Sequence, residues 1–218
     1  MPFANPTPYD YLPRRLHMEE IGNPYLVVHQ FFAWENLPEW RIHLDKWLRA
    51  ALKPSFQLNR YELVELFVRY EFIEMLVEAA SLIKGLMNSF HLPSSNLYRR
   101  MDADEEKLIP DELNAATGYF NNGYRPNIFD EQAYYPIHLD DDEQARPHRV
   151  IKRFFEYQSL PQYRDALYWW YIVAIDRTSA EDSRGDEYII KIHAMFQKLI
   201  EAVHLIHLRT PANNDNLF

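Results

Sequence analysis

The sequence contains no cysteine among its 218 residues, which excludes disulfides, cysteine-based zinc or iron–sulfur sites and thiol catalysis. It also has no long apolar run. The longest, residues 167–175, has nine residues, whereas a membrane-spanning helix needs roughly 20. A phosphate-binding loop, a nucleophile elbow and a zinc-protease signature are absent as well. We therefore expect no membrane partner and find no complete catalytic motif.

The first eight residues, Met-Pro-Phe-Ala-Asn-Pro-Thr-Pro, do not have the basic and then apolar pattern of a signal peptide. We therefore expect a cytoplasmic protein.

The net charge of −9 is concentrated in one segment. Residues 101–146 hold 12 acidic and 3 basic side chains, a net of −9, so the rest of the chain is balanced. Because a surface that binds phosphates needs an excess of positive charge, we expect no nucleic-acid partner.

Aromatic residues make up 15% of the chain, with 15 Tyr, 13 Phe and 5 Trp. Apolar residues are 47% and charged residues 25%, which is typical of a globular domain. The aromatic surplus indicates either a packed ring-rich core or an aromatic-lined ligand pocket.

Helix start and stop signals predict an all-α fold with six main helices in a single domain. Asn23-Pro24, Asn36-Leu37-Pro38 and Ser159-Leu160-Pro161 are typical of helix starts, and Lys53-Pro54 and Thr210-Pro211 of helix ends. The expected helices cover residues 24–35, 36–52, 59–88, 147–157, 160–175 and 186–209.

Between and around the helices we expect irregular structure. Residues 1–22 are predicted to form an extended arm that packs on the body through Phe3, Tyr9, Tyr11 and Leu12. Residues 90–146 are predicted to be a long acidic insertion, with short helices at 95–101 and 110–117 as alternatives. Residues 211–218 are predicted to be a loose tail.

The six helices are predicted to form two similar three-helix halves, residues 23–89 and 147–210. Without a gap, residues 31–47 align with residues 154–170 at seven identical positions, including Arg41/Arg164 and Trp47/Trp170. For the long helix that follows in each half we pair Tyr61 with Tyr188, Ile73 with Ile200 and Glu74 with Glu201. Two unrelated helix pairs that share Leu-Pro starts are the alternative.

The matched helices suggest where a ligand could bind. Trp40, Leu44, Trp47 and Ala51 form one apolar stripe, and the corresponding stripe of the second half contains Trp170. The seam between these stripes, with Trp47 and Trp170, is our candidate pocket. Arg41 and Arg164 either clamp an anionic ligand there or form salt bridges.

Histidines supply the other candidates. His29 lies on the apolar side of its helix and His193 on one edge of the last long helix; each is either a ligand-binding imidazole or a satisfied core histidine. Glu201-x-x-His204 has the spacing of a di-iron ligand pair, but it has no second copy, and we expect a solvated face. His138 and residues 140–143, with His148 downstream, either bind a divalent cation or form an acidic helix N-terminus.

Tyr11-Leu12, followed by Leu26-Val27-Val28-His29-Gln30, resembles the start of the tryptophan 2,3-dioxygenases, which are all-helical haem enzymes. The resemblance implies that His29 lies beside a substrate and that His193 is a haem ligand. It covers some 20 residues, and the family's Gly-Thr-Gly-Gly loop is missing, so we do not assign the chain to this family.

No complete catalytic set accompanies the aromatic surplus, so the leading functional hypothesis is a non-catalytic helical protein that binds a protein partner or a second copy of itself. We predict no cofactor for it. The alternative is a protein that binds a small molecule or haem through His29 and the seam. An oxidoreductase is one function that such a protein could have.

Overall fold

The computed structural model describes residues 6–53, 55–56, 58–89, 131–176 and 183–210. Within these ranges all regular structure is helical, which confirms the predicted all-α class. Six longer helices lie within a few residues of their predicted positions: α2 Tyr25–Trp34, α3 Leu37–Leu52, α4 Arg60–Ser89, α7 Pro147–Tyr157, α8 Leu160–Asp176 and α9 Ser183–Arg209.

Capping interactions explain where α3 and α4 begin. Asn36 accepts a hydrogen bond from the Glu39 backbone N–H at 3.0 Å, and the Glu39 carboxylate accepts one from the Asn36 N–H at 3.1 Å. This capping box satisfies N–H groups that have no partner inside the helix. Asn59 and Glu62 form the same arrangement at the start of α4. Asn36 therefore acts as the cap that its sequence position predicted, whereas Asn23 does not: the residue before α2 is Pro24, and no side chain caps this helix.

Short helices lie in the two segments that we expected to be irregular. Before α2 the chain forms η1 (Pro8–Tyr11) and α1 (Met18–Gly22), and before α7 it forms η4 (Glu131–Tyr134) and α6 (Asp141–Ala145). The prediction of a wholly extended arm was therefore wrong, and so was that of irregular structure as far as residue 146. The helices expected at 95–101 and 110–117 and the tail at 211–218 lie outside the described residues.

The arm is not held by its aromatic side chains either. Tyr9, Tyr11 and Leu12 are exposed, and Phe3 lies outside the described residues. We call residues 8–17 the first strap and residues 131–140 the second strap. The first strap contacts α8 through η1, and the second strap contacts α3 through η4.

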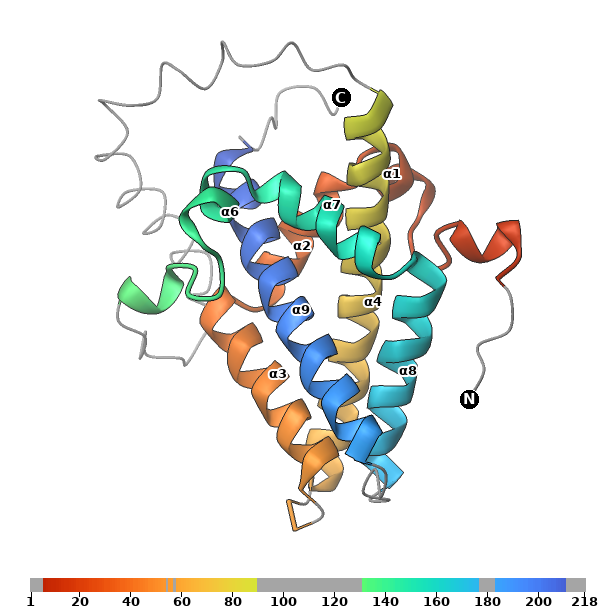
Figure 1. Cartoon of the computed structure of the whole chain (residues 1–218), viewed down its shortest axis with the longest axis vertical. Helices are drawn as coiled ribbons and strands as arrows, with labels where there is room; N and C mark the ends of the chain where they lie inside the picture. Colours follow the sequence, from red (N-terminus) through yellow and green to blue (C-terminus); the bar gives the residue numbers. More distant parts are fainter. Residues whose placement is uncertain (1–5, 54, 57, 90–130, 177–182, 211–218) are drawn as a thin grey trace.

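Four long helices form the body of the molecule, and α2 and α7 cover one end of it (Figure 1). The backbone of α3 packs against α8 and α9, and that of α4 packs against α8. Both α2 and α7 contact α4 and α9. If residues 6–89 are named the first half and residues 131–210 the second half, the long helices pack mainly across the boundary between the halves.

Aromatic rings fill the core. The predicted stripe of Trp40, Leu44, Trp47 and Ala51 is confirmed, since all four side chains are buried. Phe31 stacks on Trp40 with ring centroids 3.9 Å apart, and the Trp40 indole N–H donates to the Phe31 carbonyl. The Phe31 and Trp40 rings therefore pack closely, and the polar atom of Trp40 has a partner.

Candidate functional site

The seam between α3 and α8 is closed by its own tryptophans. The rings of Trp47 and Trp170 stack with centroids 4.3 Å apart, and both side chains are fully buried. The Trp47 indole N–H donates to the Trp170 carbonyl at 3.3 Å. The structure thus brings the two predicted residues together, and their contact occupies the place where a ligand was expected.

All three nitrogens of the Arg41 guanidinium group donate hydrogen bonds to protein acceptors. Its Nε donates to the Glu201 carboxylate at 2.9 Å, and its two Nη atoms donate to the carbonyls of Ala133 and Tyr135, each at 2.7 Å. Glu201 also accepts the backbone N–H groups of Ile137 and His138. Arg41 of α3, Glu201 of α9 and the second strap therefore form one joint, which we call the second latch.

Arg164 makes the same set of contacts at the first strap. Its Nε donates to the Glu78 carboxylate at 3.1 Å, and its Nη atoms donate to the carbonyls of Asp10 and Leu12. Glu78 accepts the backbone N–H groups of Arg14 and Arg15. Arg164 of α8, Glu78 of α4 and the first strap form the first latch.

The hydrogen bonds from the arginine and from the strap N–H groups in one latch each have a counterpart 123 residues along the chain in the other. Both glutamates are 0% exposed. A buried charge is strongly destabilising when it is unpaired, so each carboxylate needs its arginine. The two arginines form salt bridges, and their fixed contacts leave little of the guanidinium fork to bind an anion.

The expectation of a solvated Glu201-x-x-His204 face was wrong. Glu201 is held in the second latch, and His204 is 5% exposed. The second strap and α3 cover this part of α9, through His138 and Arg41. Glu201 is polar but buried, because Arg41 and the second strap, which are distant from it in sequence, pack over it and bind its carboxylate.

Three histidines gather where α2 meets α9, around Phe32. The His29 and His207 ring centroids are 4.7 Å apart, and the His204 ring meets Phe32 edge-on at 4.9 Å. Burial lowers the pKa of His204 to about 3, with smaller contributions from His207 and Arg41, and burial lowers the pKa of His207 to about 4. Burial also lowers the pKa of His29. These imidazoles are therefore neutral at pH 7.

His193 lies apart from this cluster. Its Nε2 is 2.9 Å from Asp45 Oδ1, and its ring meets the edge of Trp170 with centroids 6.0 Å apart. Burial lowers its pKa, although Asp45 acts in the opposite direction. Nε2, one of the two ring nitrogens that could bind a haem iron, therefore already contacts a carboxylate. Among the described residues, no group of three or more His, Asp or Glu side chains is arranged to hold a metal ion.

The acidic run after His138 forms the start of α6. The Asp140 carboxylate caps this helix through the Glu143 N–H at 2.8 Å, and Glu143 returns the contact. The interpretation as an acidic helix N-terminus is thus confirmed. The His138 ring turns away from the run and contacts Glu201 at 2.7 Å.

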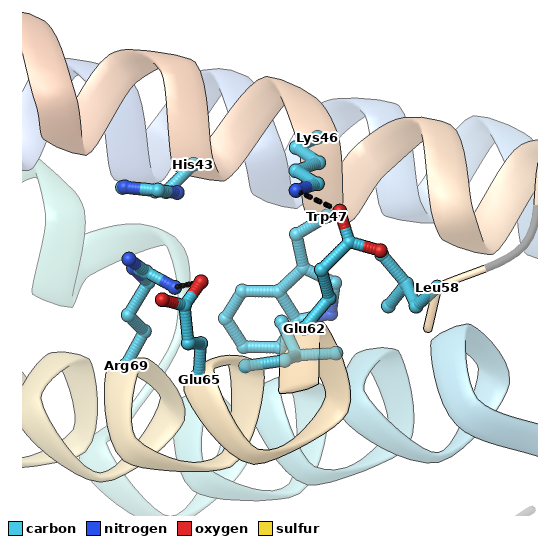
Figure 2. A pocket seen from close by; sticks show the side chains of 8 residues that line it. His43, Lys46, Trp47, Leu58, Glu62, Glu65 and Arg69 are labelled. Carbon is cyan, nitrogen blue, oxygen red and sulfur yellow. Dashed lines mark hydrogen bonds and ion pairs between the residues drawn. The ribbon is translucent and has the colours of Figure 1, made fainter. Parts of the chain in front are cut away.

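A surface hollow lies between α3 and α4 (Figure 2). His43, Lys46 and Trp47 line it from α3, and Glu62, Glu65 and Arg69 face them from α4. The hollow has an empty volume of about 260 Å³ when the adjoining open solvent is included. The space within it that water molecules can occupy is only about 20 Å³. This is small for a metabolite, because ligand pockets usually measure roughly 300–1,000 Å³.

The charges in this hollow are paired with one another. Lys46 binds Glu62 at 2.6 Å, and Arg69 binds both Glu65 and the buried Glu35. His43 Nε2 lies 3.4 Å from Glu35, which is suitable for proton transfer, but no serine, threonine or cysteine lines the hollow. The equivalent place in the second half is filled by Trp169 and Tyr188, whose ring centroids are 5.9 Å apart.

Of the six residues predicted from the sequence, the structure joins Trp47, Trp170 and His193 in one cluster and separates His29, Arg41 and Arg164 from it. The sequence analysis did not predict that the two latch glutamates, Glu78 and Glu201, are buried.

No known protein family, curated protein or solved structure matches this chain. Within the described residues, no helix has the length and apolarity needed to cross a bilayer.

Proposed function

We propose that this chain is a non-catalytic helical protein that works by binding a second copy of itself. The observation that carries the proposal is an exposed apolar surface on α4 and α8, which we call the aromatic face. It consists of Tyr61, Val64 and Phe67 on α4 and Tyr168 and Tyr171 on α8.

The aromatic face is continuous. Phe67 and Tyr171 have ring centroids 6.1 Å apart across the two helices, and Tyr70 lies beneath both rings. Val64 precedes Phe67 by one helical turn, and Tyr168 precedes Tyr171 in the same way. Tyr61 is 72% exposed, Phe67 42% and Tyr168 57%, so three large rings face water on one side of the molecule.

The size of this face fits a specific dimer. At about 200 Å² per aromatic side chain, the exposed fractions of these three rings leave roughly 350 Å² in contact with water. Two copies together therefore expose roughly 700 Å² of aromatic surface, which a dimer could bury. A specific interface at the small end of the range buries about 1,200 Å² in total, of which about 57% is apolar. The rings alone therefore supply the apolar part of such an interface.

Charge also favours a second copy as the partner. Two identical surfaces repel when they carry net charge, and the aromatic face contains no charged side chain. Three of the five positions 123 residues away are charged: Asp45 corresponds to Tyr168, Glu187 to Val64 and Arg184 to Tyr61. Only one such face is therefore apolar in each chain, so pairing of two aromatic faces closes a dimer.

The test is sedimentation or light scattering of the wild type and two matched variants. We expect the wild type to have twice the 26.2 kDa mass of one chain and Phe67→Glu to be monomeric. Ile190→Glu is the control, because Ile190 corresponds to Phe67 and is 50% exposed. A wild type that stays monomeric up to about 100 µM, or an equal effect of Ile190→Glu, would refute the proposal.

We also propose that the chain arose by internal duplication. Support comes from the two latches and from the stacked pairs Phe31–Trp40 and Phe154–Tyr163, all of which are related by 123 residues. The same shift applies to the long helices, where Glu201 makes the contacts of Glu78. Our sequence pairing of Glu74 with Glu201 differs from this by four residues, about one helical turn.

The duplication includes the straps, so it covers more than the predicted three-helix halves. Pro13, Leu16 and Glu20 in the first half correspond to Pro136, Leu139 and Glu143 in the second. The acidic insertion then shortens to residues 90–130.

A small-molecule binder is the second candidate, and the histidine cluster favours it. Both ring nitrogens of His204 are buried without a hydrogen-bond partner among the described residues. The corresponding positions of His29, His204 and His207 are Lys152, Ser81 and Lys84, so only one half carries the cluster. A visible spectrum after addition of haem tests this function: a Soret shift that is lost in His29→Ala supports it, and an unchanged spectrum removes the haem version.

A further inference from the structure

The boundary between the two halves has the features of a two-fold protein–protein interface. Its centre is the Trp47–Trp170 stack, in which each half contributes the corresponding residue. One latch lies on each side, and each latch takes its arginine from one half and its glutamate and strap from the other. The joint of arginine, glutamate and strap occurs twice, and the tryptophan stack joins a residue to its own counterpart, which is the pattern of an isologous dimer interface.

We propose that the two halves recognise each other without their covalent connection, so that each half presents a surface that fits its own counterpart. This inference rests on the proposed duplication and is independent of the aromatic face. The partner is defined by its chemistry. It is a three-helix unit with a tryptophan for the stack, an arginine that precedes this tryptophan on the same helix, and a strap that binds a buried glutamate.

Packing of the long helices supports the proposal. The backbone of α3 packs against α8 and α9, and α4 packs against α8, so the bundle is assembled from both halves. In Figure 1, helices α3 and α4 of the first half alternate with α9 and α8 of the second. A half on its own would expose Trp47 or Trp170 and leave one latch glutamate without its arginine. Each half therefore depends on the other for its core, as in an obligate dimer.

Residues 90–130 connect the halves in sequence, and a cut there leaves every contact of the latches and the tryptophan stack in place. Joining two units in one chain raises their effective concentration but adds no contact. The stability of the cut protein should therefore depend on its concentration, whereas that of the intact chain does not.

The experiment inserts a protease site after Pro110 in the full chain and cuts the folded protein. It uses the Phe67→Glu background, so that association through the aromatic face does not contribute. We expect the two fragments to elute together at the mass of one chain, to keep the helical circular dichroism of the uncut protein, and to melt at a temperature that rises with concentration.

Two variants show whether the latches hold the fragments together. Arg164→Met should weaken association of the cut protein by roughly a hundredfold or more, because it leaves Glu78 buried and unpaired. Arg153→Met is the control: Arg153 also binds a glutamate, but its side chain is 56% exposed, and we expect less than about a fivefold effect. Fragments that separate on cutting, or equal effects of the two variants, would overturn the inference.

Discussion

Replacing Arg164 with methionine should destabilise the protein far more than replacing any exposed arginine. Methionine keeps much of the side-chain volume but removes every hydrogen bond that Arg164 donates in the first latch. Of its partners among the described residues, Glu78 would then keep the two strap N–H groups, at a site that is 0% exposed. The strap would also lose the donors to the Asp10 and Leu12 carbonyls.

The expected cost is about 3–5 kcal/mol, which is the usual effect of removing one partner of a buried ion pair. For a chain of this length, each kcal/mol lowers the melting temperature by about 2–4 °C, so the shift is about 6–20 °C. Arg41→Met should cost the same within about 1 kcal/mol, because the second latch has the same contacts.

Urea unfolding followed by circular dichroism measures these free energies, with Arg153→Met as the exposed control. We expect the control to cost less than about 1 kcal/mol. The reasoning would be refuted if Arg164→Met cost no more than this control. It would also fail if the two latch variants differed by more than about 2 kcal/mol.

Three further predictions concern the core, the caps and pH. Trp47→Ala should cost about 3–5 kcal/mol in urea unfolding, because it empties a fully buried site, and a cost below about 1 kcal/mol would contradict the stacked core. Asn36→Ala should cost about 1 kcal/mol through loss of the α3 cap, and Asn59→Ala should cost a similar amount at α4. The lowered pKa of His204 means that stability is complete above about pH 6.5 and falls as the pH drops toward 3, since only the unfolded state binds the proton. Between pH 7 and 5 the wild type should therefore lose about 2 kcal/mol more than His204→Leu, and identical pH profiles of the two proteins would contradict burial of this ring.

The six longer helices could be predicted because their signals are local. Asn36, Asn59 and Ser159 each act within three residues of their own position, so the sequence shows both partners of the capping interaction side by side. The stripe through Trp40 and Trp47 could be predicted for the same reason, since a helical period is visible within one element.

The register of the long helices could not be fixed in this way. A shift of four residues returns a helix almost to the same face, so the pairings Glu74/Glu201 and Glu78/Glu201 both preserve the apolar pattern. Only contacts to other segments distinguish them, because Glu78 and Glu201 each bind two strap N–H groups and an arginine.

The straps and the burial of Glu201 were missed for a related reason. Helices of four or five residues are too short to show periodicity, and proline-rich sequence around them indicated an extended chain. Arg41 and Glu201 are 160 residues apart, so no local pattern connects them. The signal that could have found them is the alignment of Pro13, Leu16 and Glu20 with Pro136, Leu139 and Glu143.

Hydrogen exchange of the strap amides tests the paired latches most directly. Arg15 and His138 lie outside helices, and each backbone N–H donates to a buried glutamate at 2.9 and 2.8 Å, respectively. We predict strong and similar protection of both amides, lost at Arg15 alone in Arg164→Met and at His138 alone in Arg41→Met. Exchange of either amide at the rate of an unstructured peptide in the wild type would contradict the paired latches.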